Sequence, residues 1–246
     1  MSTLQGISIV VKREMKSNFS GTMIYIFTAI FSFAIGAYFY NNLLSVKEIT
    51  NITIVDQVLR PTFSAMNFLL MFFAPMITMG AFVREKRDNT LVLLKLSKLS
   101  LSQIFFSKYI ASVLSMIFII LPTLIFPIIL SFSGFNDWSM VFTNYLGVFG
   151  LVLCYLVVGV FSSLLTKNYI ISIVTSFGIL FSFLMLLSTA SLVENRIVSQ
   201  ILSYMSIGQH FFYFSQGAIV SYDLIYFASF VGFFSYISIE SLRVKK

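Results

Sequence analysis

The sequence of 246 residues is poor in charged residues, cysteine and histidine. Only 10% of its residues are charged, whereas a soluble chain of ordinary composition carries about 25%. That leaves too little polar surface to cover a water-soluble globule. The single cysteine, Cys154, excludes an intrachain disulfide. The single histidine, His210, excludes a metal site built from several histidines.

The sequence also has no phosphate-binding loop. The motif G-x-x-x-x-G-K-[ST] requires a Gly followed by Lys, and this dipeptide does not occur in the chain. The chain therefore cannot bind ATP by the P-loop mechanism. Its few ionisable residues form no pattern typical of a nucleophile with its base, so we expect no enzymatic activity, no metal and no cofactor in this chain.

Long apolar runs make up most of the sequence, in which 58% of the residues are hydrophobic and 29 are Phe. Several runs approach the roughly 20 residues that a helix needs to cross a hydrocarbon core of ~30 Å. We predict an all-α, polytopic membrane protein with about six transmembrane helices. The predicted spans are Thr22–Leu44, Thr62–Val83, Ile104–Leu130, Val141–Leu165, Tyr169–Thr189 and Leu224–Ser241.

The distribution of basic residues predicts the orientation of these spans. Six crossings place both termini on one side of the membrane, and the cytosolic side normally carries the excess of Lys and Arg. With cytosolic termini, the outer side holds only Lys47, Arg60 and Arg196, and the other thirteen basic residues lie inside. We therefore expect both termini in the cytosol. The net charge of +7 then reflects topology and requires no nucleic-acid partner.

An amphipathic helix is predicted over residues 4–19, before the first span. Its basic residues lie between apolar residues that recur at helical spacing, and a helix of this kind lies in the membrane interface. The apolar residues are Leu4, Ile7, Val11, Met15 and Phe19, and the basic residues are Lys12, Arg13 and Lys16.

The second and third spans are connected by residues 84–103, a charged segment with apolar residues at Leu91, Leu94 and Leu101. We predict a short helix that lies across the cytosolic ends of the two spans and is apolar enough to dock into a groove on a partner protein. An ordinary solvated basic loop is the alternative.

On the outer side, residues 190–222 are too apolar for a solvated loop. Ile197, Ile201 and Met205 predict a short helix in the outer leaflet or a partial re-entry into the membrane. His210, in the same segment, is interpreted as an interfacial polar anchor.

The spans contain many Ser and Thr residues but few other polar side chains. Asn67, Thr78 and Asn144 are candidates for lining a substrate path, although hydrogen bonding between helices is the commoner use of such residues. Lys108 at the start of the third span and Glu240 near the end of the sixth are expected to extend their charged groups to the interface. No internal repeat or linker divides the chain, so we treat residues 1–246 as a single transmembrane domain.

Two motifs on the predicted cytosolic side resemble those of a known family. Val11-Lys12-Arg13-Glu14 is similar to the KRE-containing first helix of the ABC-2 type permeases, in the six-helix group that includes gliding-motility and nitrous-oxide-reductase-maturation permeases. The loop of that group, E-x-x-x-G-T-x-E-L-L-L-x-x-P followed by K-Y-x-A, resembles residues 85–94 and 108–111. Residues 159–168 and 209–226 also resemble the group. The chain has Asn89 in place of the Gly, Val92 in place of the acidic residue, and Leu99 or a neighbouring residue in place of the Pro.

The resemblance implies the permease subunit of an ABC exporter in a bacterial cytoplasmic membrane. It implies a second permease copy, identical or closely related, and separate ATPase subunits that hold ATP and Mg. Glu85, Arg87 and Thr90 are our first candidates for coupling to the ATPase, because a charge pair and a helix-capping hydroxyl would orient the segment 84–103. The other coupling candidates are Leu94, Lys98, Lys12 and Arg13.

The Phe-rich spans favour an amphipathic or lipophilic cargo, such as a membrane-active peptide or a lipid, over a sugar or a metal ion. Three alternatives to the permease are open. An ion-coupled secondary carrier or channel would need ionisable groups at mid-membrane, of which the sequence has essentially none. An intramembrane enzyme and a scaffold subunit without transport activity are the other two.

Overall fold

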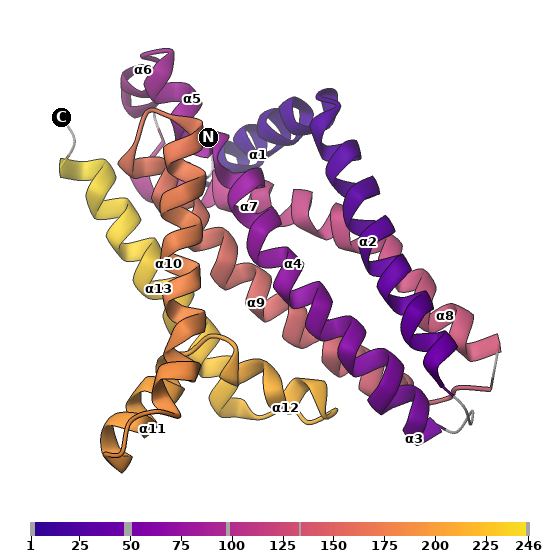
Figure 1. Ribbon diagram of the computed structural model, residues 1–246. Coiled ribbons are helices and arrows are strands. Elements are labelled where there is room, and N and C mark those ends of the chain that lie inside the picture. Colours follow the sequence, from indigo (N-terminus) through magenta and orange to yellow (C-terminus); the bar gives the residue numbers. More distant parts are fainter. Residues whose placement is uncertain (1–2, 47–50, 97–98, 133, 245–246) are drawn as a thin grey trace.

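The computed structural model describes residues 3–46, 51–96, 99–132 and 134–244, and these residues form helices joined by short connections, with no strand among them. The helices run between two ends of a bundle (Figure 1). The N-terminal helix and the last turn of the C-terminal helix lie at the same end (Figure 1). We call this the terminal end of the bundle, and the opposite one the distal end.

Six helical segments are long and apolar enough to cross a membrane, and each coincides with a predicted span. The prediction of an all-α chain with six such helices is confirmed, as expected for a multi-pass membrane protein. The segments are Met23–Ser45 (α2), Val55–Arg87 (η1, α4 and α5), Leu101–Phe132 (α7, η2 and α8), Trp138–Leu165 (α9), Tyr169–Ala190 (α10) and Ser221–Arg243, which is most of α13 (Ser221–Val244).

Prolines explain the irregular parts of two spans. The second span begins earlier than predicted, with α3 (Asn51–Ile54) and a π-helical turn, η1 (Val55–Leu59), in front of α4 (Arg60–Thr78) and α5 (Gly80–Arg87). The amide of Arg60 bonds to the carbonyl of Val55, one residue further back than in an α-helix, just before Pro61, which has no amide hydrogen. In the third span, Pro122 lies in the 3₁₀ turn η2 (Leu121–Leu124) between α7 (Leu101–Ile120) and α8 (Ile125–Phe132).

The helix α9 forms the centre of the bundle. In its most apolar stretch 78% of the residues are buried, against 17% in α10, and α9 packs on α4, α7, α10 and α13. A helix that is apolar on all sides belongs in such a central position. Gly159 of α9 allows close approach, because a Cβ atom there would overlap the side chain of Thr78 in α4.

Besides α3, five helical pieces of the described residues lie outside the spans. At the terminal end, α1 (Thr3–Ser20) runs across the ends of the spans and α6 (Leu91–Leu96) follows α5 (Figure 1). At the distal end lie α11 (Arg196–Met205), η3 (Gln209–Phe211) and α12 (Phe212–Ser215) (Figure 1). The short helix predicted within residues 190–222 is therefore present as α11, which has Ile197, Ile201 and Met205 exposed.

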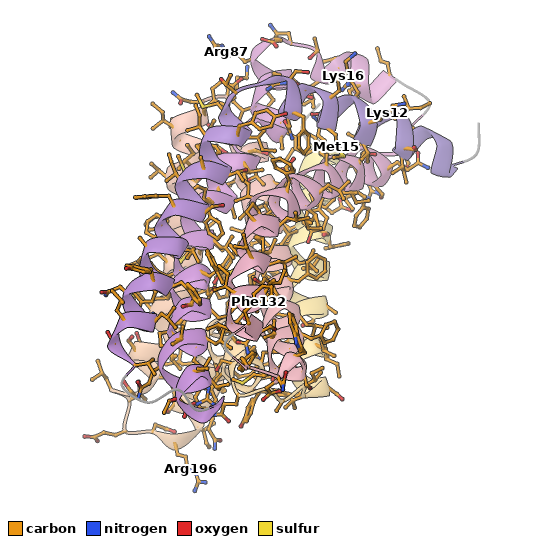
Figure 2. All side chains as sticks on the ribbon, turned by 90° about the vertical axis from the view of Figure 1, so that its right-hand side faces the viewer. Lys12, Met15, Lys16, Arg87, Phe132 and Arg196 are labelled. Carbon is orange, nitrogen blue, oxygen red and sulfur yellow. The ribbon has the colours of Figure 1, made fainter. Side chains whose placement is uncertain are left out.

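The basic side chains gather at the terminal end. Figure 2 shows Lys12, Lys16 and Arg87 there, and Arg196 at the distal end. These four residues thus lie at the ends of the bundle at which the predicted spans place them (Figure 2). The side chains of Lys47, Lys95, Lys98, Lys245 and Lys246 lie outside the described residues.

Candidate functional site

The candidate site lies where one face of α1 packs along α7. Gly6 and Val10 of this face are buried, and Asn18 donates a hydrogen bond from Nδ2 to Oγ of Ser115 at 3.1 Å. Glu14 lies between Val10 and Asn18 at the same four-residue spacing, so its carboxylate also points toward α7. Lys12 and Arg13, on the other side of α1, are exposed.

Lys108 of α7 lies beneath Glu14 and is almost completely buried. Its ammonium forms an ion pair with Glu14 at 3.0 Å and a second with Glu85 of α5, and it also lies 5.3 Å from the centre of the Phe82 ring. The expectation that Lys108 extends to the interface is therefore wrong. A buried ammonium is stable only when it is paired, and here two carboxylates from different helices surround it.

The last turn of α5 binds three helices through three consecutive residues. Arg84 donates from Nη1 to Oγ of Ser17 in α1 at 2.7 Å, and Glu85 pairs with Lys108 of α7. Lys86 donates to the carbonyl of Leu164 in the last turn of α9, where a cation also interacts favourably with the helix dipole. We call Glu14, Arg84, Glu85, Lys86 and Lys108 the ionic junction, since together they tie α1, α5, α7 and α9 at the terminal end.

The electrostatics of the junction favour the ionised form of Glu14. Burial alone raises the pKa of this carboxyl, but the charge and hydrogen bond of Lys108 act in the opposite direction. Together with Arg13, whose Nη2 lies 3.1 Å from the Glu14 carboxylate, Lys108 holds the pKa of Glu14 below its ordinary value of 4.5. Glu14 therefore carries its negative charge at neutral pH.

The connection after α5 contains the one non-glycine residue with positive φ in the described chain, Asn89, at φ +54°. The amide of Thr90 bonds back to the carbonyl of Glu85 at 2.9 Å, which is the six-residue closure of a Schellman motif. Asn tolerates this left-handed conformation better than other non-glycine residues. Asn89 stands where the resembled motif has Gly, and the backbone explains why these two residue types are alternatives there.

The helix α6 follows at once and has two apolar sides. Leu91 and Leu94 pack against the core of the bundle. Val92 and Leu96 face outward, with 62% and 77% of their surface exposed. A solvated basic loop, the alternative considered for this segment, would not present a helix with an outward apolar side beside the junction.

No protein-family model matches the chain, and no curated protein is significantly similar to it.

The structure brings some of the predicted coupling residues together. Glu85 lies inside the junction, but its partner is Lys108 and not Arg87, which is exposed at the end of α5. Thr90 directly precedes α6, and its carbonyl accepts a hydrogen bond from the amide of Leu94 at 3.1 Å. Lys98 lies outside the described residues.

Four members of the junction, Glu14, Arg84, Lys86 and Lys108, were not among the predicted site residues. Glu14 could have been found, because it is an acidic residue on the apolar face of an amphipathic helix, four residues after the buried Val10. No signal in the sequence joins it to Lys108, 94 residues later.

The three candidates for a substrate path lie elsewhere and are apart from the junction. Asn67 accepts a hydrogen bond from the hydroxyl of Tyr155 at 2.7 Å, which links α4 to α9. Thr78 donates to the carbonyl of Ala74 at 2.8 Å, and Asn144 donates to that of Met140 at 2.9 Å. A role for these residues in transport remains a prediction.

A second buried polar cluster lies at the distal end. His210 is completely buried, with Nδ1 at 2.6 Å from Oδ1 of Asp223 and Nε2 at 2.9 Å from the carbonyl oxygen of Tyr204. Its ring stacks on Tyr226, with centroids 3.7 Å apart. The interpretation of His210 as an interfacial anchor is therefore wrong. Nor does the described part of the chain contain a group of three His, Cys, Asp or Glu side chains that could hold a metal.

Proposed function

We propose that this chain is the permease subunit of an ATP-binding cassette exporter of the ABC-2 type. The observation that carries the proposal is the ionic junction, which joins the start of α6 to four helices of the bundle. A force applied to α6 passes through the adjoining α5 to α1, α7 and α9 at once. This is the mechanical property required of a segment that receives the power stroke of a separate ATPase.

The outward side of α6 supplies a contact surface for that ATPase. Val92 and Leu96 are exposed apolar residues on a short helix, and a helix of this kind docks into a groove on a partner. Exposed basic residues, among them Arg87 and Lys12, lie at the same terminal end (Figure 2). The missing phosphate loop also supports a separate ATPase, since ATP and Mg would be bound by that partner subunit and not by this chain.

In this proposal the chain lies in a bacterial cytoplasmic membrane with both termini in the cytosol. The excess of basic residues at the terminal end supports that orientation. The helix α1 then lies in the cytosolic interface, with its basic side toward the lipid head groups. A second copy of the chain, or a close paralogue, completes the permease, and the chain has no catalytic residue of its own.

The cargo we propose is amphipathic or lipophilic, such as a membrane-active peptide or a lipid, and it moves outward. The apolar composition of the spans supports this class.

Affinity purification of the tagged chain from its own membranes tests the proposal. We expect an ATPase with a phosphate-binding loop to copurify, and we expect the double variant Val92→Asp/Leu96→Asp to lose it. The matched control is Leu192→Asp, which places the same charge at an exposed leucine of the distal end and should retain the ATPase. The proposal is contradicted if no such ATPase is recovered, or if the wild type, the double variant and the control variant recover it equally.

One observation favours an ion-coupled secondary carrier as a second candidate. Lys108, Glu85, His210 and Asp223 are all buried ionisable residues, the first two at the terminal end of the bundle and the last two at the distal end. His210 and Asp223 form a pair able to hold a proton. Transport that continues without ATP and stops when a protonophore collapses the proton gradient would favour the carrier over the exporter.

A further inference from the structure

A cavity of about 280 Å³ lies at the terminal end, between the corner of α1 and α2 on one side and α4, α5 and α7 on the other. It is next to the ionic junction, but nothing in the proposed coupling mechanism uses it. Its volume is just below the range of about 300 to 1,000 Å³ that is typical of small-molecule sites. It is therefore too small for a whole membrane lipid and large enough for a head group with the first carbons of one chain.

The lining of the cavity is polar in one part and apolar in another. Glu14, Arg84 and Lys108 contribute charged groups, whereas Ile24, Phe27 and Met76 contribute apolar side chains from α2 and α4. A lining of this kind fits an amphiphile, whose polar head and apolar chain require different surroundings.

The charges of the lining decide the sign of the head group. The carboxylates of Glu14 and Glu85 are matched by two cations, because Lys108 pairs with both and Arg13 pairs with Glu14. Within the described residues Arg84 has no carboxylate partner, and its hydrogen bond to Ser17 uses one of the five guanidinium N–H groups. The uncompensated charge is thus the positive charge of Arg84, and a phosphate or carboxylate is its natural ligand.

The position along the bundle fits the same ligand. Arg84 lies near the end of the second span, whose last turn also contains Lys86 and Arg87. The ends of membrane-spanning helices lie at the depth of lipid head groups. An amphiphile in that leaflet would have its anionic head level with Arg84 and its chain level with Phe27 and Met76.

We propose that this cavity is a binding site for a single-chain amphiphile with an anionic head group, held by Arg84. The anion bonds to the free N–H groups of the guanidinium, and the first carbons of the chain contact Ile24, Phe27 and Met76. The inference requires that the chain lies in a membrane, but it is independent of ATP-driven export. The pocket is complete within one chain, so binding does not need an ATPase.

Native mass spectrometry of the chain in neutral detergent, without any partner subunit, tests the site with lysophosphatidic acid as the probe. We expect a saturable adduct of one molecule per chain. We expect Arg84→Gln to weaken binding at least tenfold, while Arg243→Gln, at an exposed arginine of the same end, leaves it unchanged. Equal losses in both variants, or no loss in Arg84→Gln, overturn the proposal.

Further measurements distinguish a single-chain amphiphile from free phosphate and from a two-chain lipid, and test whether Arg84 has only a structural role. Ser17→Ala removes the hydrogen bond of Arg84 to α1 but keeps the charge, so binding should persist and a purely structural role of Arg84 is excluded. Inorganic phosphate at the probe concentration should not compete, and phosphatidic acid, with two chains, should bind at least tenfold more weakly. Full competition by phosphate overturns the amphiphile assignment, and equal binding of phosphatidic acid overturns the single-chain assignment.

Discussion

Nδ1 of His210 lies 2.6 Å from Oδ1 of Asp223, and both side chains are buried at the distal end of the bundle. The other ring nitrogen of His210 faces the carbonyl oxygen of Tyr204, which can only accept a hydrogen bond, so Nε2 carries a proton. The contact between Nδ1 and Oδ1 then requires one more proton, on either atom. The pair therefore holds a proton in the folded chain, and it ties η3 to the first turn of α13.

The first prediction concerns this pair. His210→Leu leaves the Asp223 carboxyl buried without its partner and should destabilise the protein by about 3–5 kcal/mol, as for other buried pairs that lose one member. Asp223→Asn should cost less, because its amide can donate to Nδ1 of a neutral imidazole. Thermal unfolding in detergent measures both effects.

A double variant provides the control for the His210–Asp223 pair. His210→Leu/Asp223→Leu removes both polar groups, so it should be more stable than the sum of the two single Leu variants predicts. Additive losses would contradict the direct coupling of the two side chains.

The second prediction is a pH dependence of the ionic junction. The pKa of Glu14 is lowered in the folded chain, so its contribution to stability is complete above the ordinary value of 4.5 and is lost as the pH falls through the lower folded-state value. The melting temperature of the wild type should exceed that of Glu14→Gln at pH 7, and the gap should narrow as the pH is lowered below about 4.5. A gap that stays constant down to pH 3 would show that the charge of Glu14 does not stabilise the fold.

The third prediction concerns the left-handed residue between α5 and α6. Asn89→Gly should be neutral or slightly stabilising, whereas Asn89→Ala should cost about 1 kcal/mol, because a Cβ disfavours positive φ. Asp88→Ala is the matched control, since Asp88 is also exposed but has φ −85°. Equal effects of the two alanine substitutions on thermal stability would argue against backbone strain as the cause.

The fourth prediction compares two glycines in the spans. Gly159→Ala should destabilise the protein by about 1–3 kcal/mol, because the new methyl group would overlap Thr78 across the contact of α9 with α4. Gly178→Ala in α10, where a Cβ meets nothing within 4 Å, should instead stabilise its helix by roughly 0.5–1 kcal/mol. Thermal unfolding of both variants gives the signs, and adding Thr78→Ala should restore part of the stability lost by Gly159→Ala.

Much of the fold follows from the sequence, because a chain in hydrocarbon must satisfy its backbone hydrogen bonds within each span. Apolar runs of the required length therefore became helices, with bounds that agree with the predicted spans to within a few residues at most ends. The larger deviation, at the start of the second span, arises because the helix continues through the π turn before Pro61 into residues assigned to a loop. The absence of a Gly-Lys dipeptide also excluded the phosphate-loop motif, which no tertiary contact could supply.

The pairing of the charged residues was decided only by the tertiary structure. Glu14, Glu85 and Lys108 are separated along the chain, and each alone is best accommodated near water, so the sequence favoured an exposed Lys108. Packing α1 and α5 against α7 brings two carboxylates to one ammonium, and their attraction offsets the cost of removing these charges from water. The same reason applies to His210 and Asp223, because a buried ionisable group is stable only where another helix provides its partner.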